Sequence, residues 1–206
     1  KHLDTHTPHW KELNMQQPIR WALEDPLEKV IFDTLLLNAQ LPIIEEADKE
    51  TLNFAELSYE SFTSEQLLAK PSMMHQLFAL LVQAHYQTSP NDLQQLLNAP
   101  NINIVVAKSY SQESEKTQIV GAVLAIHEGK VNPSKQRAHG HLVPQLLTRH
   151  YAQQDFLMLS TLRVMRIAVH PSLQRKGIGI HLIQQVEKLA VQQRVDYVSS
   201  SFGGSD

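Results

Sequence analysis

The sequence predicts an α/β fold in which helices cover a mixed sheet of parallel and antiparallel strands (an α+β mixed sheet). From residue 72 onward, helical and β-type segments follow one another in the order helix, helix, strand, strand, helix, strand, helix, strand. An apolar run ending at Val169 is followed by a glycine-bearing turn and a long amphipathic segment, as in a strand that leads into a helix. With 206 residues, of which 42% are hydrophobic, the chain suits one domain and an appendage.

Residues 1–70 are expected to be a connector. Its first part is polar. Asp25 then supplies an N-cap and Pro26 a first-turn proline, so the connector is predicted to hold one helix within 18–38. The remainder of the connector is acidic and mixed, with a short β-type run at 52–58.

Residues 71–206 are expected to form the core of the domain. Ser89 and Pro90 are typical of a helix start, and Pro100 is typical of the end of that helix. A polar loop between the first two β-type runs is long enough for a hairpin. The predicted elements are helices at 73–86 and 90–98, strands at 102–109 and 118–127, a helix at 142–151, a strand at 162–169, a helix at 177–193 and a strand at 197–202.

Charge is distributed unevenly along the chain. The net charge of −3 argues against a free-standing nucleic-acid-binding protein. Residues 130–176, however, carry eight Lys and Arg residues and one acidic residue, Asp155, so this segment has a charge of +7 and the remainder −10. Such a segment could attract coenzyme A, RNA or both, or it could be a solvated face with ordinary scatter.

Composition excludes several kinds of site. The absence of cysteine excludes disulfides, thiolate metal sites and a cysteine nucleophile. The eleven histidines are dispersed without ligand spacing, so no metal is predicted. No apolar stretch approaches the ~20 residues that span a membrane, and no signal peptide is visible. We therefore expect no membrane association, and a cytoplasmic location fits.

The turn Gln174-Arg-Lys-Gly-Ile-Gly179 carries the clearest functional signal. Unpaired N–H groups and the dipole at a helix start favour an anion, here a pyrophosphate, and glycines allow the backbone to approach it. The sequence contains neither a dinucleotide fingerprint nor a P-loop. The turn instead fits the Q/R-x-x-G-x-G/A signature of GNAT acetyltransferases, where it resembles the loop that holds the pyrophosphate of coenzyme A. The alternative is a glycine-containing helix start without a ligand.

A second pattern extends over most of residues 17–203. Its stretches are Gln17-Pro-Ile-Arg-Trp21 with Asp25-Pro-Leu-Glu28, Ala84-His-Tyr-Gln-Thr-Ser-Pro-Asn-Asp-Leu93 with Asn98-Ala-Pro100, Gly140-His-Leu-Val-Pro-Gln145, and Arg166-Ile-Ala-Val-His-Pro171 through Gly179. Asp196-Tyr197 and Ser201-Phe-Gly203 agree with it. In this order the stretches resemble the RNA cytidine acetyltransferase family, specifically its bacterial branch, which acts on tRNA(Met). The His-Tyr-x-x-Ser-Pro-x-Asp-Leu stretch is far more specific than the glycine turn.

The resemblance implies a GNAT acyl-CoA N-acyltransferase fold and transfer of acetyl from acetyl-CoA to N4 of a cytidine in RNA, the wobble cytidine of tRNA(Met). It also implies two partners, a tRNA and an N-terminal helicase-like ATPase module of the same protein. No Walker A sequence occurs here, so ATP would act only through a module absent from this chain. Family members continue beyond the Ser-Phe-Gly strand, so we expect a fragment whose fold is truncated after its fifth strand.

The resemblance also implies how acetyl-CoA is held. The strand before the turn would bind the pantetheine arm through Ile167, Ala168 and Val169, with the Val169 N–H polarising the thioester carbonyl. The pyrophosphate would lie on Gln174, Arg175, Lys176, Gly177, Ile178, Gly179 and Ile180. The two basic side chains of this turn could equally face solvent.

His85 is the candidate general base, because it lies in the most specific stretch and titrates near neutrality. The alternative is that it caps the last carbonyls of its helix. Tyr86 would protonate the departing thiolate or position the cytosine ring, whereas His170 is expected to be structural. The candidate RNA contacts are Lys135, Arg137, His139 and His141.

Two other functions remain open from the sequence. One is a GNAT enzyme that acts on a protein or a small-molecule amine, which the glycine turn permits and the His85 stretch argues against. The other is a non-catalytic acyl-CoA-binding module. Stabilisation by acetyl-CoA and a salt-dependent affinity for tRNA would discriminate among them.

Overall fold

The computed structural model describes residues 10, 11, 13, 19–44, 57–84, 90–99, 101–111, 116–132 and 140–202. The chain divides into two compact units, residues 1–38 and residues 39–206. None of the described helices is long and apolar enough to cross a membrane.

The first unit contains helix α2, Pro26–Leu35. The carboxylate of Asp25 accepts a hydrogen bond from the N–H of Leu27 at 2.8 Å, and a proline occupies the first helical position. The helix therefore begins where the sequence predicts, with an N-cap and a residue whose missing N–H needs no partner. No residue of α2 is buried.

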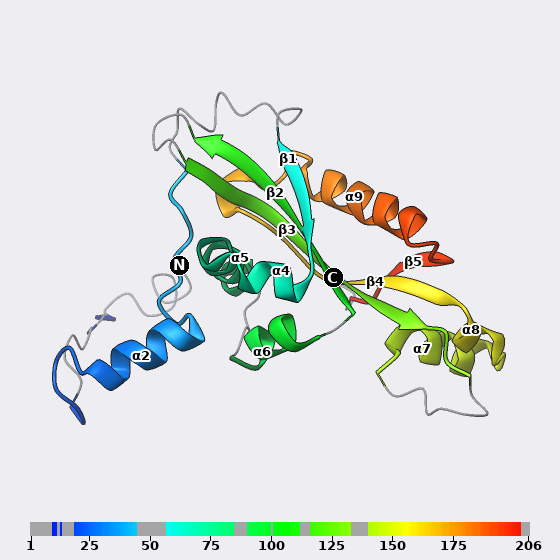
Figure 1. Cartoon of the computed structure of the whole chain (residues 1–206), viewed down its shortest axis with the longest axis horizontal. Helices are drawn as coiled ribbons and strands as arrows, with labels where there is room; N and C mark the ends of the chain where they lie inside the picture. Colours follow the sequence, from blue (N-terminus) through cyan, green and yellow to red (C-terminus); the bar gives the residue numbers. More distant parts are fainter. Residues whose placement is uncertain are drawn as a thin grey trace. The chain divides into compact units, whose positions relative to one another are not determined.

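The second unit is built on a five-stranded sheet with the order β1-β2-β3-β4-β5 (Figure 1). The first four strands pair antiparallel with their neighbours, whereas β4 and β5 run parallel. This mixed sheet confirms the predicted fold class. The elements are β1 (Ser58–Phe62), α4 (Ser64–Leu68), α5 (Pro71–Ala84), α6 (Pro90–Asn98), β2 (Ile102–Ser111), β3 (Lys116–Gly129), α7 (Leu142–Tyr151), α8 (Asp155–Met158), β4 (Ser160–Val169), the 3-10 turn η2 (Pro171–Leu173), α9 (Ile178–Gln192) and β5 (Tyr197–Ser200).

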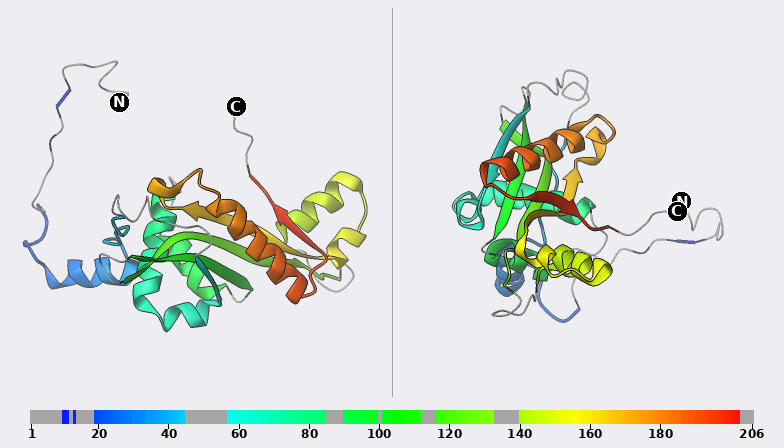
Figure 2. Two further views of the ribbon diagram at one scale, coloured as in Figure 1. Left: turned by 90° about the horizontal axis from the view of Figure 1, so that it is seen from above. Right: turned by 90° about the vertical axis from the view of Figure 1, so that its right-hand side faces the viewer.

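Helices cover both faces of this sheet (Figure 2). On one face, Leu182 of α9 shares a buried core with Leu162 of β4. On the other face, Leu77 of α5 lies in a second core together with apolar side chains of α4 and α6. Because successive side chains of a strand point to opposite faces, β2 supplies Val105 to the first core and Ile104 to the second.

Helices α7 and α8 pack against each other and against β3, at the far end of the β3–β4 hairpin (Figure 1). The chain enters α7 from the segment that follows β3 and leaves α8 directly into β4. These two helices therefore occupy the connection between β3 and β4.

Two elements before α5 differ from the sequence prediction, which also contains no counterpart of α8 or η2. The first strand lies at Ser58–Phe62, whereas the sequence places a β-type run at 52–58, of which residues 52–56 lie outside the described residues. Helix α4 starts at a capping box formed by Thr63 and Gln66. Both elements belong to the unit that holds the sheet, although the sequence analysis assigns them to the connector. Pairing of β1 with β2 joins segments far apart in the chain and leaves no local signal.

Candidate functional site

The candidate site is built on β4, whose two halves have different neighbours. Residues Thr161–Val164 pair with β5 on one side and with β3 on the other. The register between β3 and β4 then shifts between Leu124 and Ala125, which leaves Met165 without a partner as a β-bulge. Within the described residues, β5 does not pair with β4 after this bulge. From the bulge to Val169, the edge of β4 that faces away from β3 therefore has no recorded strand partner among the described residues, and we refer to it as the open edge.

The backbone of Val169 faces this open edge. The N–H of the next residue, His170, donates to the carbonyl of Val120 on β3 at 2.9 Å. Since successive N–H groups of an extended chain point to opposite sides, the N–H of Val169 points away from β3. The Nε2 of Gln174 donates a long hydrogen bond of 3.5 Å to the Val169 carbonyl, which ties the end of β4 to the following turn.

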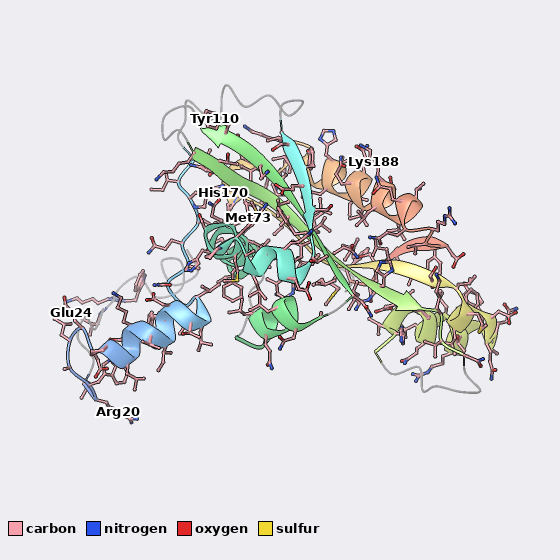
Figure 3. All side chains as sticks on the ribbon, viewed as in Figure 1. Arg20, Glu24, Met73, Tyr110, His170 and Lys188 are labelled. Atoms are coloured by element: carbon pink, nitrogen blue, oxygen red, sulfur yellow. The ribbon has the colours of Figure 1, made fainter. Side chains whose placement is uncertain are left out.

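The His170 side chain, at the end of β4, fixes the start of that turn (Figure 3). Its Nδ1 accepts a hydrogen bond from the N–H of Ser172 at 3.3 Å. The proton of the ring is therefore on Nε2, which donates to the carbonyl of Pro42 at 3.1 Å. The residue is only 6% exposed. These contacts give His170 the structural role that the sequence predicts.

Two residues of the turn have left-handed backbone conformations, Arg175 with φ 61° and Gly177 with φ 88°. A Cβ at Gly177 would meet no atom within 4 Å, so the glycine is required by its φ angle and the space beside it is open. Gly179 has no such φ, and a Cβ there would lie 3.9 Å from Cδ1 of Ile167, an ordinary contact. Of these two glycines, only Gly177 has a backbone conformation that requires glycine.

Helix α9 begins directly after Gly177 with unpaired amides. Its hydrogen-bond ladder starts at the N–H of His181, which donates to the Gly177 carbonyl at 3.2 Å. Among the described residues, no acceptor is recorded for the N–H groups of Ile178, Gly179 and Ile180, and no side chain caps the helix. Such amides, at the positive end of the helix dipole and beside open space, are suited to an anion.

Apolar side chains lie between the open strand edge and the turn. Ile167 of β4 is 37% exposed, and its side chain reaches toward Gly179 of the helix. Ile180 is 67% exposed, whereas Ala168 is buried in the core under α5. The predicted residues of β4 and of the turn are thus brought together around one open edge. The side chains of the two basic turn residues, Arg175 and Lys176, are exposed.

The candidate catalytic residues His85 and Tyr86 lie outside the described residues, as do the candidate RNA contacts Lys135, Arg137 and His139. Helix α5 ends at Ala84, one residue before the candidate base. The assignments of these five residues therefore stay predictions.

His141, the fourth candidate RNA contact, is described and has a partner within the protein. It precedes the first residue of α7, and its Nδ1 accepts a hydrogen bond from the N–H of Gly129 at 2.9 Å. The imidazole therefore contacts the end of β3. An RNA contact by its other nitrogen stays a prediction.

Asp196, which immediately precedes β5, contacts the first residue of β4 at the end where these two strands are paired. Its carboxylate accepts hydrogen bonds from both the N–H and the hydroxyl of Ser160, each at 2.7 Å. These hydrogen bonds lower the pKa of Asp196 below its ordinary value, since they stabilise the charged form. In the sequence, Asp196 is identified only as part of a shared stretch. Its partner lies 36 residues earlier, so no spacing pattern could reveal the contact.

Within the described part of the chain, no group of three or more His, Asp or Glu residues is arranged to hold a metal ion.

Comparison with known protein families gives two matches. The model of the family described as GNAT acetyltransferase 2 matches residues 76–201. The model of the helicase domain of the RNA cytidine acetyltransferase NAT10/TcmA matches residues 1–38. The two matched segments fall in the two compact units of the chain.

Curated relatives match nearly the whole chain. A tRNA(Met) cytidine acetyltransferase TmcA from Nitrosococcus halophilus is 36% identical over 214 residues, which cover 98% of this chain and 27% of that protein. The enzyme of the same name from Vibrio cholerae is 37% identical, covering 99% of this chain and 28% of that protein. The chain thus spans little more than a quarter of the length of these relatives.

Solved structures are more distant. The structure of AAC(6')-Iy in complex with the bisubstrate analog CoA-S-monomethyl-acetylneamine is 12% identical, with a TM-score of 0.48 over 73% of this chain and 82% of that chain.

Proposed function

The chain belongs to the GNAT acetyltransferase 2 family, and we propose that it is the acetyltransferase part of a larger ATP-dependent enzyme that acetylates N4 of a cytidine in RNA. The proposed donor is acetyl-CoA, and the proposed target is the wobble cytidine of tRNA(Met), in keeping with the names of the relatives. The helicase-domain match over residues 1–38 supports an ATPase module of the same protein as the partner that uses ATP. A cytoplasmic location is part of this proposal.

The observation that carries the proposal is the open edge of β4 beside the unpaired amides of α9. The amides of Ile178, Gly179 and Ile180 would bind the pyrophosphate, to which they offer three donors and the positive end of the helix dipole. The open backbone edge from Ile167 to Val169 would bind the amide groups of the pantetheine arm, and Ile167 would cover its methylenes.

The direction of the Val169 N–H supports its proposed role in the chemistry. An N–H group that points away from β3 into the open edge can donate a hydrogen bond to the thioester oxygen and stabilise the negative charge that develops on it. Removing one such donor in other acyl-transfer enzymes costs about 10²–10³ in rate. The N–H belongs to the strand itself, so no rearrangement is needed when the charge appears.

The proton transfers and the RNA contacts are assigned to side chains that the sequence predicts. The cytosine amine attacks the carbonyl carbon, its proton passes to His85, and the sulfur leaves as a thiol after receiving a proton from Tyr86. Base assistance of this kind contributes about 10²–10⁴-fold. Lys135, Arg137, His139 and His141 are the proposed contacts to the RNA.

The test uses the full-length protein that contains this chain. It is incubated with acetyl-CoA, ATP and total tRNA, and acetylated nucleotides are mapped by mass spectrometry. We expect N4-acetylcytidine at the wobble position of tRNA(Met). Gly177→Glu should abolish the product, because a carboxylate at this position repels the phosphate and its side chain fills the open space.

Other outcomes would point to the other functions. Acetylation of a protein or a small amine without acetylated RNA would favour a different GNAT substrate. Stabilisation of the protein by acetyl-CoA without any transfer would favour an acyl-CoA-binding module. Absence of any effect of acetyl-CoA on the melting temperature would remove the donor from the proposal.

A further inference from the structure

Glu128, the second-last residue of β3, has a side chain with no solvent exposure. A carboxylate in such a position is unfavourable unless each of its oxygens has a partner. Both oxygens have one. Oε1 accepts from Nε of Arg163 on β4 at 2.6 Å, and Oε2 accepts from the backbone N–H of Val143 on α7 at 3.0 Å. One buried side chain therefore joins a strand of the sheet to a helix outside it.

Helix α7 depends on this contact for its start. Its N-cap residue, His141, makes no side-chain capping hydrogen bond within the helix. The carboxylate of Glu128 instead accepts a hydrogen bond from the N–H of Val143 in the first turn, where its negative charge also interacts favourably with the positive end of the helix dipole. The imidazole of His141 accepts from the N–H of Gly129, so two consecutive residues of β3 hold the entry to the helix.

The same end of β3 also holds the chain that leaves it. The N–H of Lys130 donates to the carbonyl of Leu159 at 3.1 Å, and the N–H of Val131 donates to the carbonyl of Leu157 at 2.8 Å. The chain is therefore fixed where it departs after Val131 and where it returns at His141. By sequence, the segment between these two points carries the basic residues proposed to contact RNA.

Arg163, on the other side of the carboxylate, belongs to the strand of the candidate site. It immediately precedes Val164, the last residue of β4 that pairs with β5. The bulge at Met165 and the open edge follow directly. The Arg163 side chain is 15% exposed and has its recorded ion pair with Glu128.

We propose that Glu128 is a positioning residue, which holds the entry to α7, where the proposed RNA contact His141 lies, at a fixed place relative to the acetyl-CoA edge of β4. This inference rests on the proposed function. A tRNA that contacts His141 would then present its cytidine at a set distance from the thioester. Loss of the carboxylate would displace the RNA while the amides of α9 and the open edge of β4 still bind acetyl-CoA. Misplacement of reacting groups by about 1 Å costs on the order of 10²-fold in rate.

The test compares Glu128→Gln with Ser64→Ala in the full-length enzyme. Glutamine has nearly the same size, but it can accept only one of the two hydrogen bonds and brings a donor toward the other partner. Ser64 is a matched control for lost stability, since its buried hydroxyl joins α4 to α6 by donating to the Leu96 carbonyl at 2.7 Å. Both variants are assayed at a temperature at which circular dichroism shows them folded.

We expect kcat/KM for tRNA to fall about 10²-fold in Glu128→Gln, with a change of less than about threefold in the Kd of acetyl-CoA. Ser64→Ala should retain both values. Arg163→Lys, which keeps the positive charge, should retain more activity than Arg163→Met. Wild-type kcat/KM for tRNA in folded Glu128→Gln would overturn the proposal. An equal loss of acetyl-CoA binding and of tRNA turnover would also overturn it, because it would indicate general damage to the core.

The assay separates this proposal from the proposed function. If the wild-type enzyme acetylates no tRNA, the proposed function fails, and the role of Glu128 is judged by hydrogen exchange instead. The amide of Val143 is expected to be protected in the wild type and to exchange at least tenfold faster in Glu128→Gln. Unchanged protection of this amide would show that Glu128 does not hold α7.

Discussion

Replacing Gly177 by alanine tests the cofactor site while keeping the fold nearly intact. The added methyl group would meet no protein atom within 4 Å, so it causes no clash inside the chain. It does oppose the φ angle of 88°, which an L-residue adopts at a cost of about 1–2 kcal/mol. Gly140 offers a matched control, because its φ is also 88° and its Cβ would also meet nothing within 4 Å. Both substitutions should therefore lower the melting temperature by a similar amount.

The two variants should differ only when acetyl-CoA is present. At a concentration of 100 times Kd, the ligand stabilises a protein by about 2.7 kcal/mol, which for a unit of this size raises the melting temperature by about 5–11 °C. A methyl group beside the pyrophosphate should weaken binding at least tenfold, or about 1.4 kcal/mol. In Gly177→Ala the same concentration would then add about 1.4 kcal/mol, a rise of about 3–6 °C.

The assay is a thermal melt of the wild type and both variants over a series of acetyl-CoA concentrations, with Kd obtained independently by calorimetry. Gly140→Ala should show the full rise of the wild type. Equal Kd values for Gly177→Ala and the wild type would refute the reasoning, because the open space beside Gly177 would then hold no ligand. A much larger loss of stability in Gly177→Ala than in Gly140→Ala would refute the assumption that only the φ angle matters.

Three further predictions concern stability, pH and RNA. Gly129→Ala should lower the free energy of unfolding by roughly 2–5 kcal/mol in denaturant titrations. The reasons are that φ is 90° and that the added Cβ would lie 1.7 Å from the Leu159 carbonyl oxygen. A loss under about 1 kcal/mol would contradict this geometry. Since the pKa of Asp196 is lower in the folded chain than its ordinary value of 3.8, its carboxylate stabilises the fold above that value and loses this effect as the pH falls below it. The difference in melting temperature between the wild type and Asp196→Asn should therefore shrink below about pH 4, and a constant difference would exclude this cause. Arg137→Ala should weaken tRNA binding and reduce the slope of log K against log salt by about 0.7–0.9, whereas an unchanged slope would exclude a phosphate contact.

The turn before α9 could be predicted from the sequence because its signals are local. A glycine that takes a left-handed φ, a preceding apolar strand and a following amphipathic helix all lie within one short segment. Gly177 thus occupies the N-cap of the helix, as the sequence suggests. Gly179 has no φ angle that requires glycine. No described atom crowds a Cβ there, so a need for glycine would come from a ligand, as expected from the sequence.

The junction around Glu128 could not be predicted, because it depends on the register of two strands. Glu128 and Arg163 are 35 residues apart and come together only when β3 and β4 pair. The sequence predicts that the second strand of the hairpin ends at His127, and Arg163 is among the basic residues of 130–176. The ion pair shows that one of those charges is compensated by a carboxylate just outside the segment. The charge available to RNA is correspondingly smaller than the sequence count.

The parallel pairing of β4 with β5 has a consequence for the order in which the unit assembles. Of the strand pairs in the sheet, β2 and β3 are joined by a short loop, whereas β4 pairs with β3 after residues 130–159 and β5 pairs with β4 after the crossover through α9. The separation of β4 from β5 beyond Val164 therefore forms after the β2–β3 hairpin, when the crossover docks. A nucleotide thioester held there would bridge segments that meet after that hairpin has formed. It should accordingly slow unfolding more than it speeds folding.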